Sequence, residues 1–480
     1  MLSVAVARLK FLEKDEEELI HQQSIECLET IGVKIKSERV LKMLGNAGAE
    51  IDTKTMIAKI PEGMVKDALK STPKEMTLYA RDPKHNLKIP VSSFPYTATT
   101  GLGVYIVDLK TGKRRPSTRK DIADFIRVAD ALDGIDYVWT SLTATDVPQL
   151  THGLHELWTA FQNTTKHVQG VEILNAEDAK KQIELGALVA GGMEELRKKP
   201  CFSVIHCSIA PLMFEREAVE AMVEFNKAGI PVCTMTMSLS GGTAPVTMAG
   251  TLVNGNSENL ASFVISQVAN KGAPVIYCSS SAPVSMKTGM IDYMTVNQPL
   301  LATGFAQMAK RYGMPCMVGD WGVNDKPEPG IPQTFSEVMG ISLSTMSGTD
   351  LQSGIGGLDA VKGAALEQEV IEAYIWENVR KFMTPFVIDK ESCALDVIKA
   401  VGHGNTFLSH IHTAKNFKRE IILRDPEKGR FEATLSNKMV PEAKRIAEKI
   451  LKEHKPVPLD PDIVKKGNEI IREWEKHLAV

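Results

Sequence analysis

Residues 201–239 contain one complete strand–helix–strand unit and read CFSVIHCSIAPLMFEREAVEAMVEFNKAGIPVCTMTMSL. Two apolar runs, at 201–208 and 231–239, flank a stretch with helical spacing at Arg216–Ala228. The runs do not alternate polar and apolar residues, so we expect both faces of each strand to be buried. Such strands are typical of a parallel sheet that helices cover on its faces.

The same rhythm extends on both sides of this unit. Helical stretches such as Asn256–Asn270 and Gly363–Lys381 separate further apolar runs. An open doubly wound sheet is the competing fold, but it usually has fewer strands, and no G-x-G-x-x-G follows a first strand. Seven strands, with an eighth placed within Met383–Asp389, therefore predict an α/β fold of the (β/α)8 TIM-barrel type. The five further runs lie at 136–143, 167–173, 274–280, 315–320 and 349–354.

The pattern divides the chain into three predicted parts. They are an N-terminal helical and β-hairpin extension over 1–116, a TIM-barrel domain over 117–430 and a C-terminal helical tail over 431–480. Within the extension, Asp15–Ile31 is expected to be a helix, and Thr111-Gly112 is expected to form a hairpin turn.

Composition excludes several classes of function. The 480 residues carry 56 Lys and Arg against 59 Asp and Glu, a net charge of −3, so the chain lacks the basic excess of a nucleic-acid-binding protein. No stretch approaches the ~18 consecutive apolar residues of a membrane span, and the N-terminus turns charged at Lys10 without a signal-peptide pattern. The seven cysteines form no C-x-x-C pair. We therefore expect a reduced, cytoplasmic protein without structural zinc.

Four segments of the chain carry distinctive motifs, and they lie at 103–132, 208–232, 238–280 and 402–420. The hairpin segment has the pattern D-x-x-T-G-x-R-R-P, and a late segment reads GHGNTFLSHIHTAKNFKRE. Together the four segments resemble one known family, the trimethylamine:corrinoid methyltransferases. Order and spacing agree from about residue 30 to residue 430, which is nearly the whole chain.

This resemblance implies a TIM-barrel enzyme that moves a methyl group from an amine to the Co(I) centre of a separate corrinoid protein. Members acting on trimethylamine carry a pyrrolysine near the sixth strand, whereas residues 318–326 here read VGDWGVNDK. The chain therefore resembles the non-pyrrolysine branch, whose members include glycine betaine:corrinoid methyltransferases. Glycine betaine, converted to dimethylglycine, is the first expectation; proline betaine, carnitine and gamma-butyrobetaine are alternatives.

The carrier histidine of corrinoid proteins lies in a D-x-H-x-x-G string, which this sequence lacks. We therefore expect no tightly bound cofactor, and a cobalamin-type corrinoid that arrives on a partner protein. Family members are often oligomeric, which leaves a homo-oligomer open.

A quaternary amine substrate suggests three kinds of binding residue. Aromatic side chains hold quaternary ammonium groups, and the candidates are Trp321, Phe94 and Tyr96. Carboxylates that offset the cation are expected at Asp320 and Glu172. Donors to a substrate carboxylate are expected at His206, Gln352 and Ser279.

Neither a covalent nucleophile nor a metal is expected, because a quaternary amine already carries a good leaving group. His410 and His412, two residues apart, have the wrong spacing for a metal site on a helix.

Two alternatives belong to other classes. A non-catalytic betaine-binding protein would use the same cage without chemistry. A lyase or aldolase with a Schiff base needs a lysine inside a barrel strand, and the expected strands are nearly free of lysine apart from Lys166 at an edge.

Overall fold

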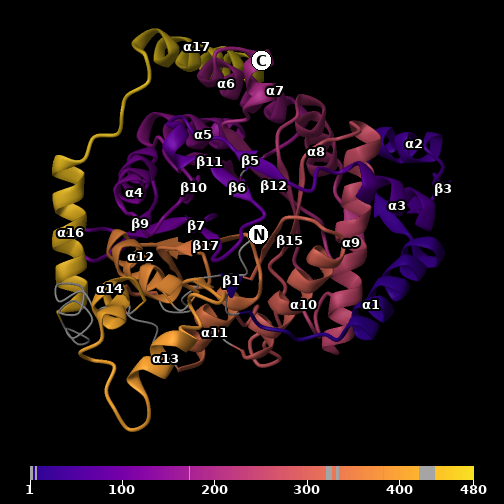
Figure 1. Cartoon of the computed structure of the whole chain (residues 1–480). Coiled ribbons are helices and arrows are strands. Elements are labelled where there is room, and N and C mark those ends of the chain that lie inside the picture. Colours follow the sequence, from indigo (N-terminus) through magenta and orange to yellow (C-terminus); the bar gives the residue numbers. More distant parts are fainter. Residues whose placement is uncertain are drawn as a thin grey trace.

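The computed structural model (Figure 1) describes residues 4–5, 8–171, 173–293, 295–319, 327–330, 335–381, 383–420 and 438–479. Eight parallel strands close into a barrel, which confirms the predicted TIM-barrel fold. Each of the seven expected apolar runs contains one barrel strand. In barrel order the strands are β7 (Tyr96–Thr99), β10 (Tyr137–Trp139), β11 (His167–Gly170), β12 (Phe202–Cys207), β14 (Val232–Thr236), β15 (Val275–Ser279), β16 (Cys316–Val318) and β17 (Leu351–Ile355).

The remaining strand is not where the sequence placed it. Met383–Asp389 contains only β20 (Phe386–Val387), which pairs with β1 (Val4–Ala5) outside the barrel, so that prediction is wrong. Strand β7 completes the barrel between β10 and β17. The barrel therefore begins before residue 117, and β16 is its seventh strand rather than its sixth.

Helices follow the strands and cover the barrel. In Figure 1, α9 and α10 lie on one side of the strands and α4 and α12 on the other. Helix α4 begins at a reciprocal cap, because Thr118 and Asp121 bond each other's backbone. The helices are α4 (Arg119–Ala131), α5 (His152–Asn163) after the 3-10 turn η3 (Gln149–Thr151), α6 (Ala176–Ala190), α7 (Met193–Lys198), α8 (Arg216–Ala228), α9 (Met248–Ala269), α10 (Asn297–Arg311), α11 (Phe335–Met346) and α12 (Leu366–Lys381).

The N-terminal extension packs on the outside of the barrel and closes one end of it. Its first helix is continuous with a π-helical turn, so the expected helix at Asp15–Ile31 is confirmed, and it contacts α9. The elements are α1 (Lys14–Glu26), η1 (Cys27–Ile31), β2 (Val33–Ile35), α2 (Glu38–Asn46), β3 (Glu50–Asp52), β4 (Ile57–Lys59), α3 (Glu62–Ser71), β5 (Met76–Leu78), η2 (Pro83–His85) and β6 (Leu87–Ile89). Strands β2–β4 form a sheet with β13 (Met213–Phe214).

The β5–β6 hairpin plugs the amino-terminal end of the barrel. Leu78, Leu87 and Ile89 belong to the same apolar cluster as the side chains inside the barrel. A second hairpin, β8 (Tyr105–Val107) and β9 (Arg114–Pro116), confirms the turn expected near Thr111. It forms a small sheet with β18 (Gly357–Leu358) and β19 (Gly363–Ala364), which follow β17.

Two tail helices, α16 (Met439–Glu453) and α17 (Pro461–Leu478), are confirmed with a break between them. The tail is tied to the barrel helices by polar contacts. His454 Nε2 lies 2.7 Å from Asp130 Oδ2, and the Trp158 indole N–H donates to Asn468 at 3.0 Å. Gly467 allows this contact, because a Cβ there would lie 2.1 Å from the Trp158 ring.

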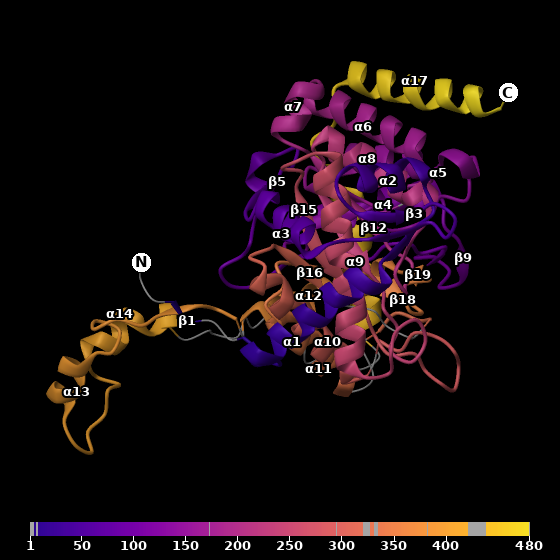
Figure 2. The same cartoon turned by 90° about the vertical axis from the view of Figure 1, so that its right-hand side faces the viewer.

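Between α12 and the tail, a segment with α13 (Leu395–Val401) and α14 (Ile411–Glu420) extends away from the barrel (Figure 2). All seven cysteines are free thiols. Among the described residues, no helix combines the length and the apolar character needed to cross a membrane.

Candidate active site

Strand alternation separates residues inside the barrel from those facing the helices. The apolar inner residues form one cluster. The polar side chains of Gln169 and Ser203 lie among them, because Gln169 pairs with Trp139 and its amide donates to Ser203 Oγ at 3.0 Å and to Cys233 Sγ at 3.1 Å. The residues that alternate with these along each strand point outward, toward the helices. The cluster comprises Ala98, Tyr137, Trp139, Ile205, Cys233, Met235, Ile276, Cys278, Met317 and Leu351, together with the plugging hairpin. Because β5–β6 closes the amino-terminal end, the open end is the one at which the strands finish, where active sites of this fold lie.

Trp139 is the last residue of β10 and lies at this open end, which we call the mouth. Its ring packs on Gly101, where a Cβ would lie 2.4 Å from the indole. Thr99 Oγ1 accepts hydrogen bonds from the Trp139 N–H at 2.9 Å and from Ser141 Oγ at 3.0 Å. The indole nitrogen itself is buried and has no hydrogen-bond partner among the described residues. The ring is thus fixed in place at the end of the strand, and only 7% of the residue is exposed.

Sequence reasoning missed Trp139 because the run DYVWTSLT is indistinguishable from core. Only its position could have identified Trp139, because it is the last residue of a strand and lies on the inner face.

Ser280 follows β15 on the same face as Cys278 and is a second residue at the mouth. Its hydroxyl lies 3.5 Å from the hydroxyl of Tyr293, which comes from the loop after β15. Tyr293 is not among the residues that the sequence predicted. Ser280 and Tyr293 bring hydroxyl groups to the mouth.

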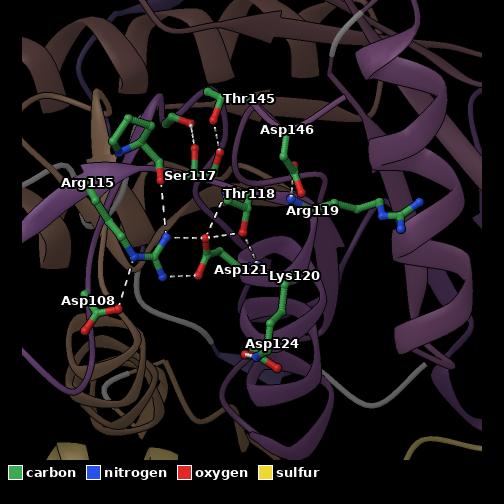
Figure 3. A network of polar contacts seen from close by, with 12 residues as sticks. Asp108, Arg115, Ser117, Thr118, Arg119, Lys120, Asp121, Asp124, Thr145 and Asp146 are labelled. Atoms are coloured by element: carbon green, nitrogen blue, oxygen red, sulfur yellow. Dashed lines mark hydrogen bonds and ion pairs between the residues drawn. The ribbon is translucent and has the colours of Figure 1, made fainter. Parts of the chain in front are cut away.

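The hairpin β8–β9 forms a rigid rim beside the end of β10 (Figure 3). Arg115 donates two hydrogen bonds to Asp121, at 2.6 and 2.7 Å, and one to Asp108 at 3.1 Å. Asp108 also accepts from the backbone and hydroxyl of Thr111, and these contacts lower its pKa to about 2, against a small effect of burial. Ser117 Oγ then bonds the carbonyl of Thr143 at 2.7 Å. The D-x-x-T-G-x-R-R-P motif therefore has a structural role, because these contacts hold the hairpin to the start of α4 and to the chain after β10.

Three predicted donors lie on the outer face of the barrel instead of in the mouth. Ser279 is in register with outward-facing residues, and its hydroxyl donates to Ser281 at 2.9 Å. Gln352 pairs with outward-facing Thr97 and is fully buried. Both residues lie on barrel strands, as predicted, but on the outer face instead of the inner one. The two faces are easily confused because neighbouring residues on a strand point in opposite directions.

His206 is also on the outer face of its strand. Its ring stacks on Phe214 with centroids 5.9 Å apart, and burial lowers its pKa to about 4. Neither ring nitrogen has a hydrogen-bond partner within the described part of the chain. The imidazole is therefore neutral and packed, and it is not positioned to bind a substrate carboxylate.

The two predicted aromatic residues of the N-terminal region lie at the opposite end of the barrel. Tyr96 begins β7, pairs with Leu351 and packs on the inner cluster near the plug. Phe94 precedes it, and the Arg380 guanidinium lies 5.1 Å from the centre of its ring. Both residues therefore lie away from the mouth, because the chain enters the barrel here at its amino-terminal end.

The remaining candidates Trp321, Asp320 and Glu172 lie outside the described residues. Within the described part, no group of three His, Cys, Asp or Glu side chains could hold a metal ion. His410 and His412 adjoin α14, where the His410 ring nitrogen accepts the backbone N–H of His412 at 3.1 Å.

Lys166 is not available for a Schiff base in the barrel. Its ammonium group donates to three backbone carbonyls, of Ala129, Leu132 and Ile135, at 2.6–2.9 Å. Burial lowers its pKa to about 8. Because it precedes β11 and faces α4, it stabilises the connection between these elements.

A buried carboxylate supports the strand ends from outside. Glu258 of α9 accepts hydrogen bonds from Ser208 and Thr236 at 2.6 Å, and from Asn254 and the Leu212 N–H at 2.9 Å. Four donors compensate a carboxylate with no exposed surface. The ends of β12 and β14 are thereby held to α9.

Fold and site define a TIM-barrel protein with an uncharged, aromatic floor at the mouth among its described residues. The chain belongs to the trimethylamine methyltransferase (MTTB) family, whose model matches residues 1–478.

Relatives cover essentially the whole chain. The trimethylamine methyltransferase MttB of Desulfitobacterium hafniense is 32% identical over 466 residues, 96% of this chain and 93% of its own. The MttB of Methanosarcina barkeri is 30% identical, covering 98% and 96%. A glycine betaine methyltransferase of Desulfitobacterium hafniense is 27% identical, covering 98% of both. The crystal structure of the Methanosarcina barkeri monomethylamine methyltransferase (MtmB) has a TM-score of 0.55 at 13% identity, covering 94% and 90%, and supports the fold.

Proposed function

We propose that this protein transfers a methyl group from a quaternary amine, glycine betaine first, to a corrinoid carried by a partner protein, releasing dimethylglycine. The observation that carries the proposal is Trp139, a fixed indole face at the mouth of a barrel whose inner cluster is uncharged. Quaternary ammonium groups bind aromatic faces because the ring quadrupole attracts a cation that has no hydrogen to donate.

The substrate follows from the stretch after β16. Residues 318–326 contain only standard amino acids, whereas the family resemblance associates trimethylamine with a pyrrolysine there. A quaternary amine needs no such residue, because its leaving group is already a neutral tertiary amine. The relative that is named a glycine betaine methyltransferase supports this choice.

The reaction balances without acid–base catalysis by the protein. The reduced corrinoid supplies the electron pair that forms the bond to the methyl carbon, and the electrons of the broken C–N bond stay on nitrogen. No proton moves. The chain's own residues orient the substrate along the barrel axis and exclude water. Because positive charge leaves nitrogen in the transition state, a modest aromatic contact serves catalysis better than a tight cage.

The corrinoid is expected to arrive on the partner. Asp82-Pro83-Lys84-His85 is the segment most similar to a carrier motif, but Asp82 caps the backbone of Lys84 at 3.1 Å, and the spacing is wrong. Seven free thiols are in keeping with the reduced, cytoplasmic setting that Co(I) chemistry needs.

The test follows the absorbance of a corrinoid protein reduced to Co(I) after adding the enzyme and one amine at a time. Methylation with glycine betaine and none with trimethylamine is the expected result. Methylation with proline betaine, carnitine or gamma-butyrobetaine instead would keep the reaction and replace the substrate. Calorimetric binding of a betaine without methylation by any corrinoid protein would refute the enzyme and leave a binding protein.

A further inference from the structure

The serine run at 279–281 is divided between the two faces of the barrel wall. Ser279 and Ser281 have structural roles, because Ser279 Oγ donates to Ser281 Oγ at 2.9 Å and Ser281 Oγ accepts the Ser238 N–H at 3.1 Å. Ser280 lies on the inner face, and its N–H donates to the Thr236 carbonyl at 3.0 Å. This backbone contact holds the Ser280 hydroxyl at the mouth.

The loop after β15 folds back on itself and returns Tyr293 to the mouth. Val284 pairs with Ile291 in an antiparallel bridge, and the Val284 N–H donates to the Ser240 carbonyl at 3.1 Å in the neighbouring loop. Tyr293 follows shortly after this bridge and is partly exposed, with its hydroxyl 3.5 Å from Ser280 Oγ. The Tyr293 side chain therefore reaches from the loop to the inner wall of the barrel.

These two hydroxyl groups lie across the mouth from Trp139. In the closed barrel, β10 and β15 are separated by three strands on either side, so they are opposite each other. Trp139 ends β10 and Ser280 follows β15, both on the inner face and at the same end of the barrel. The mouth therefore has an indole on one wall and two hydroxyl groups on the opposite wall.

The two walls differ in the charge that they can bind. An aromatic ring attracts a cation, whereas hydroxyl groups donate hydrogen bonds to a carboxylate. The two hydroxyl oxygens are 3.5 Å apart, at the outer limit of a hydrogen bond, so little is lost when both turn toward a ligand. The two oxygens of a carboxylate can then accept one hydrogen bond from each side chain.

Neutral donors suit a ligand whose own charges balance. A lysine or arginine at this wall would bind simple anions strongly, whether or not they carried an ammonium group. Hydroxyl groups give a weaker contact, which adds to affinity only when the cation is bound as well.

We propose that Ser280 and Tyr293 form a carboxylate subsite, which selects quaternary amines that carry a carboxylate and directs their ammonium end toward Trp139. This inference rests on the proposed function, because it names the residues that recognise the other end of a betaine. It also gives a reason for rejecting trimethylamine and choline, which have no carboxylate to occupy the subsite.

The test measures ligand binding to the full-length protein by calorimetry, without a corrinoid protein. Two probes divide the betaine, because tetramethylammonium keeps the cation and lacks the carboxylate, whereas 3,3-dimethylbutyrate keeps the carboxylate and lacks the cation. Tyr293→Phe and Ser280→Ala should each raise the Kd of glycine betaine and of 3,3-dimethylbutyrate about ten-fold, because each removes a hydrogen bond to a charged group. The Kd of tetramethylammonium should change by less than about two-fold, since it accepts no such bond.

Matched controls remove the same chemical groups elsewhere. Tyr79→Phe removes a phenol hydroxyl beside the hairpin at the closed end of the barrel. Ser279→Ala removes the hydroxyl of the adjacent serine, which faces outward. Both controls should keep the wild-type ratio between the Kd values of glycine betaine and tetramethylammonium.

Equal weakening of all three ligands, or betaine binding that neither variant changes, would overturn the carboxylate subsite. The proposed function fails separately. Betaine binding with the expected pattern in the variants, but no methyl transfer to any corrinoid protein, would refute the enzyme and keep the subsite. Methyl transfer from betaine with a wild-type KM in both variants would keep the enzyme and refute the subsite. A wild-type protein that binds no betaine would overturn both.

Discussion

The guanidinium of Arg380 lies 5.1 Å from the centre of the Phe94 ring, so an aromatic residue expected to hold a substrate cation holds one of the protein's own. Arg380 also pairs with Asp136 and donates to Thr97 Oγ1 at 3.0 Å, which ties the end of α12 to the first two barrel strands. The contact closes the amino-terminal end of the barrel. Cation binding at Phe94 is therefore structural, and a search for the substrate's cation site moves to the mouth.

At the mouth, Trp139→Leu should lower kcat/KM for the betaine about ten-fold, because a cation–π contact contributes about 1–2 kcal/mol. Trp139→Phe should recover part of the loss. The measurement is corrinoid methylation at varied substrate concentration. The uncharged isostere 3,3-dimethylbutyrate serves as the control ligand, and its inhibition constant should change much less than the KM of the betaine. Equal losses for both would show that Trp139 contributes shape rather than cation binding.

Two buried glutamates should differ in their response to the same substitution. Glu258→Gln replaces one acceptor oxygen by an NH2 group that faces hydrogen-bond donors, so we expect unfolding to become easier by about 2–3 kcal/mol. Glu369→Gln should cost little, because neither oxygen of Glu369 has a hydrogen-bond partner among the described residues. Urea unfolding at neutral pH measures both. Similar effects at the two positions would contradict the hydrogen-bond account of Glu258.

Glu369 should also make the stability of the fold depend on pH. Burial raises its pKa well above the ordinary range, despite the opposing charge of Lys166. The folded protein then binds a proton that the unfolded chain releases above about pH 4.3. The stability that Glu369 contributes is therefore fully present below that pH. It is lost as the pH rises toward the pKa of Glu369 in the folded protein.

The comparison of wild type with Glu369→Gln isolates this contribution. The variant should gain stability over wild type between pH 5 and pH 8, as measured by urea unfolding at both values. Glu372, whose pKa burial also raises, is present in both proteins. A constant difference across this range would mean that Glu369 is already ionised in the fold.

The docking of α17 should depend on Gly467. Gly467→Ala places a methyl group 2.1 Å from the Trp158 ring, so we expect the helix to detach at a cost of about 1–3 kcal/mol. Limited proteolysis between His454 and Asp460 should then accelerate at least several-fold. Gly63→Ala is the matched control, because nothing lies within 4 Å of a Cβ there, and Ala should slightly stabilise α3. Unchanged cleavage of the Gly467 variant would show that the helix shifts without loss.

Periodicity identified most of the barrel but not its first strand. The other seven strands lie within mostly apolar runs that do not alternate polar and apolar residues, which makes them visible in the sequence. Strand β7 has Thr97 and Thr99 on its outer face, where Thr97 Oγ1 bonds the Gly134 carbonyl at 2.8 Å. When the polar side chains of a buried strand make their hydrogen bonds inside the protein, a hydrophobicity pattern does not reveal the strand. Phe386–Val387, which lies in the run predicted to hold the missing strand, pairs with β1 outside the barrel instead.

The spacing of residues along a strand was sufficient to place His206, Gln352 and Ser279 on barrel strands. It was not sufficient to tell the inner face from the outer, because both faces are buried and both tolerate small polar residues. Trp139 and Ser280 differ from these residues only because they occupy the alternate positions along their strands, which face inward. Which alternate positions face inward is fixed by closure of the barrel around Leu78, Leu87 and Ile89, which come from a hairpin distant in sequence.

The amino-acid order alone was therefore enough to specify the class of fold and the family, because these depend on local periodicity and on motifs read along the chain. Folding in three dimensions was needed to bring β7 between β10 and β17, to turn Trp139 toward the mouth, and to extend the segment with α13 and α14 away from the barrel. Those features depend on contacts between residues far apart in the sequence, which no local pattern records.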